Sequence, residues 1–389
     1  MLMLYLLAAA YFARACMPHI KKKFAVYGKH AQVLFLLLFA IAALLPIIGA
    51  FLKPHYFAAP LRRAGNLWLG FLIYLFLGTA IWETAAMGFR KIDPKRGERQ
   101  DHPWRKGGLL ILAAVFLVSM GVVHTQKIRT VHYTVPVAAS ENVSLKIAFV
   151  ADLHMGCQIG SAQIARMVQK INQMDPDLVL FGGDMYDSDY DMLENPDRLA
   201  ETLRQIHSRY GVYGVYGNHD VTETLIGGFS ISPRSRAYRD ERMAELLKKS
   251  NITMLEDAVV PVAGGKLWLV GRLDGEKSGR GLAKRKSAQE LMGQTDEKTP
   301  VIVLEHEPSE LDDLAALGAD VVLSGHTHAG QFFPLTLPRS LIWENAYGLK
   351  KIGAMESIVT SGVGVYGPSM RLLTNSEVVQ IDLKCGAEK

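Results

Sequence analysis

Long uncharged apolar runs occupy the first third of the chain. Residues 31–52, 64–82 and 107–125 contain no Asp, Glu, Lys or Arg. A helix of about 20 residues crosses the hydrocarbon core of a bilayer, so we expect each run to span a membrane. The alternative, three buried core helices of a soluble protein, fits runs this close together poorly. Residues 1–13 form a shorter apolar segment without the preceding positive charge of a signal peptide, and we expect it to be a short first span. About four spans are predicted over residues 1–125, an all-α transmembrane bundle.

From about residue 145 the pattern changes to short apolar runs that alternate with amphipathic stretches. Helices are predicted over 162–174 and 198–208, and strands over 145–151, 178–181, 212–216, 266–271, 301–304, 319–323, 357–361 and 377–383. Alternating strands and helices indicate packed α/β layers. Residues 126–144 are interpreted as a connector and 223–240 as a loop or lid. A domain over 145–385 has about 240 residues, which is enough to bury a sizeable core.

Composition agrees with a membrane protein and excludes several other classes. Hydrophobic residues make up 49% of the 389 residues, which excludes disordered and collagen-like chains. Three cysteines are too few for a disulfide scaffold. The net charge of +5 divides unevenly, because residues 1–125 hold 15 basic and 4 acidic residues and the remainder holds 28 and 34. The basic residues lie in short loops between apolar runs, which does not support nucleic-acid binding.

The basic residues also favour one orientation in the membrane. Residues 14–29 hold five Lys and Arg and residues 90–106 hold seven, whereas residues 53–63 on the opposite side hold three. Loops rich in Lys and Arg face the cytoplasm as a rule. The count therefore predicts a cell-membrane protein whose C-terminal domain lies outside the cytoplasm.

Polar clusters follow five of the predicted strands. The carboxyl ends of strands in α/β sheets form the ligand crevice, so these clusters are expected to converge. They hold five of the seven histidines after residue 126. An isolated histidine is usually structural, but five histidines among Asp and Asn predict a metal site of Mn, Fe or Zn. The clusters are Asp152-Leu153-His154, Gly182-Gly183-Asp184, Gly217-Asn218-His219-Asp220, Glu305-His306-Glu307 and Gly325-His326-Thr327-His328.

Such a set can serve phosphoryl chemistry. One aspartate can bridge two metals through its two oxygens. Two metals about 3.5–4 Å apart can clamp a phosphoryl group and supply a hydroxide nucleophile at neutral pH.

The order DxH, GGD, GNHD, H and GHTH resembles the calcineurin-like metallophosphoesterase superfamily over about residues 145–385. The extension GHTHAGQ at 325–331, together with the membrane region, is similar to its transmembrane branch. That branch also resembles a lipid-A-pathway pyrophosphatase acting on UDP-2,3-diacylglucosamine. The implied fold is a layered β-sandwich flanked by helices.

The resemblance also implies roles for individual residues. Asp152, His154 and His328 would hold one divalent metal, Asn218, His306 and His326 the other, and Asp184 would bridge the two. His219 would protonate the leaving oxygen or stabilise the transition state, and Asp220 would orient His219.

These features predict a membrane-anchored, binuclear-metal phosphohydrolase that uses a metal-bound hydroxide. The anchor favours a lipid-linked phosphoester or pyrophosphate such as UDP-2,3-diacylglucosamine. UDP-linked sugars are cytosolic, however, which conflicts with the predicted orientation. A broad phosphomonoesterase or phosphodiesterase that the anchor only localises is an alternative. A metal-binding membrane scaffold or transporter is another, but the complete set of ligand and acid positions argues against a scaffold. The scarcity of charge within the spans argues against an ion transporter.

Several other reactive or charged residues fall outside this pattern. Cys157 is interpreted as a loop thiol rather than a ligand, Cys16 lies at a membrane edge and Cys385 lies near the tail. The loop residues Arg234, Arg236 and Arg239, and also Arg371, either grip a phosphate or headgroup or are simply solvated.

Overall fold

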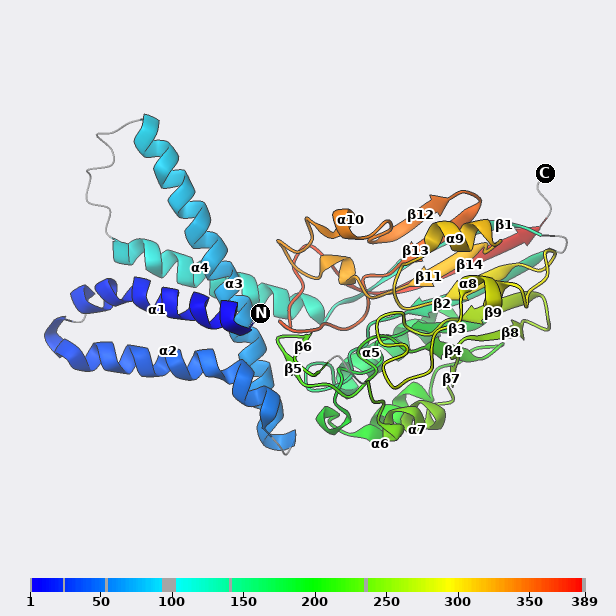
Figure 1. Ribbon diagram of the computed structural model, residues 1–389, viewed down its shortest axis with the longest axis horizontal. Helices are drawn as coiled ribbons and strands as arrows, with labels where there is room; N and C mark the ends of the chain where they lie inside the picture. The colour runs from blue at the N-terminus through cyan, green and yellow to red at the C-terminus, as the bar shows by residue number, and fades with distance from the viewer. Residues whose placement is uncertain are drawn as a thin grey trace. The chain divides into compact units, whose positions relative to one another are not determined.

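The computed structural model describes residues 2–23, 25–52, 55–92, 103–139, 142–233 and 237–386 (Figure 1). The chain forms two compact units. One comprises Met1–Met120 together with Gly367–Ser369, and the other comprises Gly121–Tyr366 together with Met370–Lys389.

The first unit is helical, as predicted. Its helices are α1 (Leu2–Lys23), η1 (Ala25–Tyr27), α2 (Gly28–Phe51), α3 (His55–Ile92) and α4 (Pro103–Thr125), whose last five residues belong to the second unit. Among the described residues, three helical segments are long and apolar enough to cross a membrane, at 25–51, 57–88 and 107–125. The three long apolar runs are therefore confirmed as helices. The helix α1 is not among these three segments, because Arg14 and three lysines lie in its second half, and its span stays a prediction.

The second unit contains two six-stranded sheets and a small hairpin (Figure 1). The first sheet has, in spatial order, β1 (Ile128–Ala138), β14 (Ser376–Gly386), β2 (Val143–Val150), β3 (Leu178–Gly182), β4 (Val212–Val215) and β7 (Thr253–Met254). The second has β12 (Gly348–Ile352), β13 (Met355–Val359), β11 (Val321–Ser324), β10 (Val301–Leu304), β9 (Leu267–Gly271) and β8 (Ala258–Val262). The hairpin pairs β5 (Leu225–Ile226) with β6 (Phe229–Ser230), inside the predicted loop at 223–240.

The sheets pack face to face and carry helices on their outer faces. Side chains alternate across β2, so Ile147 and Phe149 join the core between the sheets while Ala148 and Val150 join the core under the helices. The first sheet is covered by α5 (Ser161–Met174), α6 (Pro196–Leu203) and α7 (Glu241–Lys249), and the second by α8 (Ala288–Met292) and α9 (Leu311–Ala316). This arrangement is the predicted layered α/β sandwich flanked by helices.

The segment interpreted as a connector instead contains an edge strand of the first sheet. β1 pairs in parallel with β14 along its whole length, from Ile128 opposite Ser376 to Ala138 opposite Gly386. Several of its side chains are exposed because it lies at the edge, so its apolar pattern is weak. The domain therefore begins before residue 145.

Strand directions place the functional loops at one end of the first sheet. β2 runs antiparallel to β14, with Phe149 opposite Val379, and β3 and β4 run parallel to β2. The carboxyl ends of β2, β3 and β4 therefore lie at the end of the sheet where β1 begins, directly after α4.

Candidate metal centre

The predicted ligands sit in loops that directly follow buried strands. Asp152 and His154 follow β2, Asp184 follows β3, and Asn218 follows β4. His306 follows β10, and His326 and His328 follow β11 of the other sheet. The structure thus brings together residues more than 150 positions apart in the chain, because the carboxyl ends of both sets of strands face one crevice.

The backbone of these loops is strained at the ligands themselves. Non-glycine residues rarely have a positive φ, and such residues cluster at functional sites. Five of the seven predicted ligands have one, with φ of 53° at Asp152, 47° at His154, 50° at Asp184, 68° at His326 and 49° at His328. Each loop therefore turns sharply at the residue whose side chain enters the site.

Asp152, His154 and His328 form the first ligand group. The Nε2 atoms of His154 and His328 lie 3.0 Å apart, and Nε2 of His328 lies 3.6 Å from Oδ1 of Asp152. All three side chains are buried. Three potential ligand atoms of this group lie within 4.8 Å of one another.

His306, His326 and Asn218 form the second ligand group. Nε2 of His306 lies 3.2 Å from Nδ1 of His326 and 3.2 Å from Oδ1 of Asn218. The other ring nitrogen of His306 is bound to the backbone, with Nδ1 2.8 Å from the Gly182 carbonyl oxygen. This contact orients the ring so that Nε2 faces the site.

Asp184 lies between the two groups. Its Oδ2 is 3.6 Å from Nε2 of His154 and 3.1 Å from Nε2 of His306. Its Oδ1 accepts a hydrogen bond of 2.7 Å from the backbone N–H of His219. A single oxygen, rather than both, therefore faces both groups.

The donor set fits divalent metal ions. Burial and the charge of His306 lower the pKa of His326 to about 3, and burial and His154 lower the pKa of His328 well below its ordinary value. Burial alone would raise the pKa of Asp184, but the neighbouring His306 and His219 hold it well below its usual range. Imidazole nitrogens that face one another beside an ionised carboxylate are the kind of ligands that Mn, Fe and Zn take.

Two glycines make room for this arrangement. At Gly183, with φ of +87°, a Cβ would lie 2.7 Å from Nδ1 of His306. At Gly217 it would collide with Oδ1 of Asp184. A side chain at either position would displace a predicted ligand.

His219 lies at the edge of the first ligand group. Its ring centroid is 5.0 Å from that of His154, and its Nδ1 is 3.3 Å from Oγ of Ser188. With His154 and Asp187 it also forms a third cluster of potential ligand atoms within 4.8 Å. Position alone therefore permits both a proton-transfer role and a ligand role.

Asp220 is engaged differently from the expectation that it orients the His219 ring. Its carboxylate accepts hydrogen bonds from the backbone N–H groups of Tyr186 and Gly217, at 2.9 and 2.7 Å. Among the hydrogen bonds of the described residues, Ser188 rather than Asp220 is the side-chain partner of the His219 ring. Asp220 thus fixes the turn that carries Asn218 and His219.

Sequence reasoning missed two residues beside the histidines. Asp187 places Oδ1 3.7 Å from Nδ1 of His154, where a carboxylate can orient a ligand histidine. The only sequence signal was its place three residues after Asp184. Tyr366 packs its ring 4.9 Å from that of His328, in a loop without a motif.

Arg371, for which the sequence left two roles open, is buried behind His328 rather than solvated. Its Nη2 donates to the carbonyl oxygens of Ser361 and Gly364, the latter at 2.8 Å, and lies 3.4 Å from Nδ1 of His328. Burial lowers its pKa to about 10. Arg371 therefore holds the loop behind the first ligand group.

Other residues singled out from the sequence are not members of the ligand groups. Glu305 is buried and accepts hydrogen bonds from Arg272 and Arg285, at 2.8 and 2.7 Å. Arg239 pairs with Glu256 and lies over the Tyr216 ring, while Arg234 and Arg236 lie outside the described residues. Cys157 and Cys385 are buried and, like Cys16, form no disulfide.

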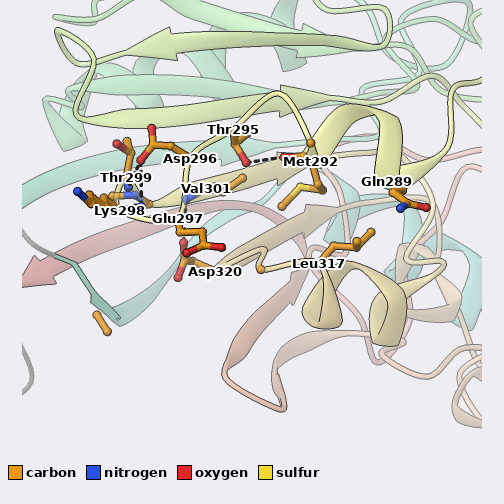
Figure 2. Close-up of a pocket in the computed structure, with 14 residues that line it drawn as sticks. Gln289, Met292, Thr295, Asp296, Glu297, Lys298, Thr299, Val301, Leu317 and Asp320 are labelled. Carbon is orange, nitrogen blue, oxygen red and sulfur yellow. Dashed lines mark hydrogen bonds between the residues drawn. The ribbon is translucent and has the colours of Figure 1, made fainter.

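A pocket of about 490 Å³ lies elsewhere in the domain (Figure 2). It is lined by Asp296, Lys298 and Asp320, among others, near the amino ends of β10 and β11. The metal-ligand loops leave the carboxyl ends of these strands, and none of the predicted ligands lines the pocket. The pocket is therefore separate from the candidate centre.

The fold and the ligand groups define a class of metal-dependent phosphoesterases, and comparison with known proteins gives the family. Residues 145–330 match the model of the calcineurin-like phosphoesterase family. A transmembrane protein with metallophosphoesterase domain from Danio rerio is 31% identical over 291 residues, which cover 71% of this chain and 62% of that protein. The chain therefore spans less than two thirds of that relative.

Two bacterial proteins are also similar to this chain. An uncharacterized metallophosphoesterase of Campylobacter jejuni is 28% identical, covering 71% of this chain and 68% of that protein. The phosphodiesterase YaeI of Escherichia coli is 29% identical, covering 61% of this chain and 82% of that protein. These comparisons support a metal-dependent phosphoester hydrolase with membrane-spanning helices.

Proposed function

We propose that this protein is a membrane-anchored phosphohydrolase that cleaves a phosphoester or pyrophosphate bond of a lipid-linked substrate with two divalent metal ions. The observation that carries the proposal is the position of Asp184, whose Oδ2 faces both His154 and His306. A carboxylate shared between two groups of buried ligands is suited to a binuclear centre.

Asp152, His154 and His328 would hold one metal ion, and Asn218, His306 and His326 the other. When bound, the two ions would withdraw charge from the phosphoryl oxygens and lower the pKa of water. His219 would supply a proton to the leaving oxygen, and Ser188 beside Nδ1 would help to orient its ring. Asp220 would hold the turn between β4 and this histidine.

The membrane region supports a lipid-linked substrate. Helices that span the bilayer confine the centre to the membrane surface, where amphiphilic phosphoesters and pyrophosphates are concentrated. UDP-2,3-diacylglucosamine is one candidate if the domain faces the cytoplasm. The Lys and Arg distribution favours the opposite side, so a phosphoester exposed on the outer surface is the better match.

Reporter fusions will determine the side of the membrane. A fusion of alkaline phosphatase after Thr125 should be active, and a fusion of green fluorescent protein at the same position should not fluoresce. The reason is that the basic loops are expected to stay in the cytoplasm, which places Thr125 on the opposite side of the membrane. The control is the same pair fused after residue 96, in a basic loop, where the two signals should be reversed. Fluorescence after Thr125 would place the domain in the cytoplasm and restore UDP-2,3-diacylglucosamine as a candidate.

Metal dependence and bond type will test the activity. The full chain in detergent, stripped with a chelator, should lose hydrolysis of an aryl phosphodiester and recover it with Mn²⁺ or Zn²⁺, because the seven proposed ligands combine four imidazoles with two carboxylates and a carboxamide. A matched phosphomonoester, tested in parallel, tests the alternative of broad specificity, and the similarity to the phosphodiesterase YaeI of E. coli favours the diester. Full activity without metal, or no cleavage of any phosphoester or pyrophosphate with metal, would contradict the proposal.

A further inference from the structure

An exposed apolar surface lies beside the loops of the metal centre. It consists of Leu335, Leu337, Leu341, Ile342 and Leu373, with exposed fractions of 40%, 66%, 88%, 67% and 78%. We call these five residues the apolar rim. Isolated exposed leucines are common on proteins, whereas a cluster of this kind usually marks a contact surface.

The apolar rim joins two neighbouring chain segments. The first runs from the GHTHAGQ loop into the short helix α10 (Arg339–Ile342), and the second surrounds Leu373. They are hydrogen-bonded to each other, with Phe333 N–H donating to the Leu372 carbonyl at 3.2 Å and Leu372 N–H donating to the Gln331 carbonyl at 3.3 Å. The rim is thus attached to the loop that carries His326 and His328.

The same segment around Leu373 is bound to the end of α4. The N–H of Arg371 donates to the Gly121 carbonyl at 3.1 Å, and Oγ of Ser376 donates to the Thr125 carbonyl at 3.1 Å. The His124 ring contacts the Asn375 side chain at 2.9 Å. Residues 107–125 of α4 are apolar enough to span a membrane, so the bilayer surface is expected near Thr125.

The sheet register agrees with this position. β1 begins next to α4 at the end of the first sheet where β2, β3 and β4 end, so the metal-ligand loops are at the α4 end of the domain. Figure 1 shows α10 in orange, away from the arrowhead of β14. The rim, the ligand loops and the end of the membrane helix therefore share one end of the domain.

The side chains and backbone of the rim suit a bilayer interface. Leu341 and Ile342 are exposed, whereas their neighbours Arg339 and Trp343 face the protein, with Arg339 donating to the Ala329 carbonyl and the Trp343 ring 5.1 Å from that of His326. These contacts attach α10 to the ligand loop and leave its leucine and isoleucine free to enter the interface. Leu373 adopts a positive φ of 67° while its side chain is exposed. This conformation is rare for a non-glycine residue, so the surrounding backbone holds the exposed leucine in place.

We propose that the apolar rim inserts into the same bilayer that α4 spans, and so holds the metal centre against the membrane surface. The occupant is the acyl-chain and headgroup boundary of the lipid. This inference rests on α4 as a membrane span and does not require the phosphohydrolase activity. If that activity holds, amphiphilic phosphates would reach the centre without leaving the membrane.

Lipid quenching will test the contact in the full chain reconstituted into vesicles. Leu341→Cys and Leu373→Cys, made in a Cys16→Ser background and labelled with bimane, should lose about half of their fluorescence in lipids with brominated acyl chains, since the rim would lie about 5–10 Å into the interface. Leu317→Cys is the matched control, because Leu317 is an exposed leucine near the amino end of β11. Its label should be quenched by aqueous iodide and not by brominated lipid.

Two outcomes would overturn the proposal. Iodide quenching at residue 341 equal to that at residue 317, without lipid quenching, would show that water covers the rim. Protection from iodide without lipid quenching would show that protein covers it.

A second measurement uses Leu337→Ser, Leu341→Ser and Ile342→Ser together, which should slow cleavage of a vesicle-embedded phosphodiester about tenfold and leave cleavage of a soluble aryl diester unchanged. If the triple variant cleaves both substrates as fast as the parent does, that result would also contradict the membrane contact. If the parent chain cleaves neither substrate, only the proposed activity is contradicted.

Discussion

Replacement of Asp184 by asparagine is expected to abolish phosphoester hydrolysis and to lower the metal content of the protein. The substitution preserves shape but removes the negative charge from the atom that lies 3.6 Å from His154 and 3.1 Å from His306. Loss of an outer partner of a metal ligand usually costs 10–100-fold, so loss of a shared ligand should cost at least about 100-fold in activity. Turnover of an aryl phosphodiester and metal content by elemental analysis are measured on the same samples.

Asp312→Asn is the matched control, because Asp312 is an exposed aspartate on α9. It should retain activity and metal.

The structural role of Asp184 must also be separated from its role as a ligand, since its Oδ1 accepts a hydrogen bond from the His219 N–H. Asparagine can keep that hydrogen bond, so thermal unfolding of the metal-free variant should resemble that of the metal-free parent. Parent-like turnover with metal retained would contradict a binuclear centre bridged by Asp184.

Replacement of His219 by alanine is expected to lower turnover by about 10²–10⁴, the usual contribution of a positioned acid or base. The loss should be a transition-state loss, because negative charge develops on the leaving oxygen only as the bond breaks. The deficit should therefore shrink for substrates whose leaving groups need little protonation. The measurement is turnover of the parent and His219→Ala over aryl phosphodiesters of graded leaving-group pKa.

His207→Ala, at an exposed histidine outside the centre, is the control and should behave like the parent. An equal deficit over the whole series would exclude proton donation by His219. Loss of metal in His219→Ala would assign it to the cluster with His154 and Asp187, within 4.8 Å, and make it a ligand instead. Ser188→Ala, which removes the partner 3.3 Å from Nδ1, should give a smaller deficit with the same leaving-group dependence.

The buried strands were predictable because their signal is local. Leu178–Gly182 and Val301–Leu304 are short, continuous apolar runs, and a strand buried on both faces needs no other pattern. The edge strand β1 was missed because its exposed residues include Arg129 and its partner β14 lies about 250 residues further along the chain. Pairing of that kind leaves no mark in a short window of sequence.

The convergence of the candidate ligands was predictable from motifs, but the supporting contacts were not. Asp, His and Gly at strand ends identify the candidate ligands, whereas the partners of each ligand depend on how distant loops meet. Arg371 illustrates the limit, since nothing near it in the sequence indicates burial against His328. The hydrogen bonds of Asp220 could not be predicted for a related reason, because its carboxylate accepts from the backbone N–H groups of Tyr186 and Gly217.

The division of α4 between the two units has a consequence for chimeric proteins. Exchange of the membrane region for that of another protein is usually planned at the end of the last helix, which here is Thr125. Gly121–Thr125, however, belong to the second unit, and a Cβ at Gly121 would lie 2.8 Å from that of Met370. A foreign helix joined at residue 126 would place an unrelated side chain at this contact and rotate the Arg371 segment behind His328. The transplantable module therefore starts inside the helix, at Gly121, and the anchor that can be exchanged ends at Met120.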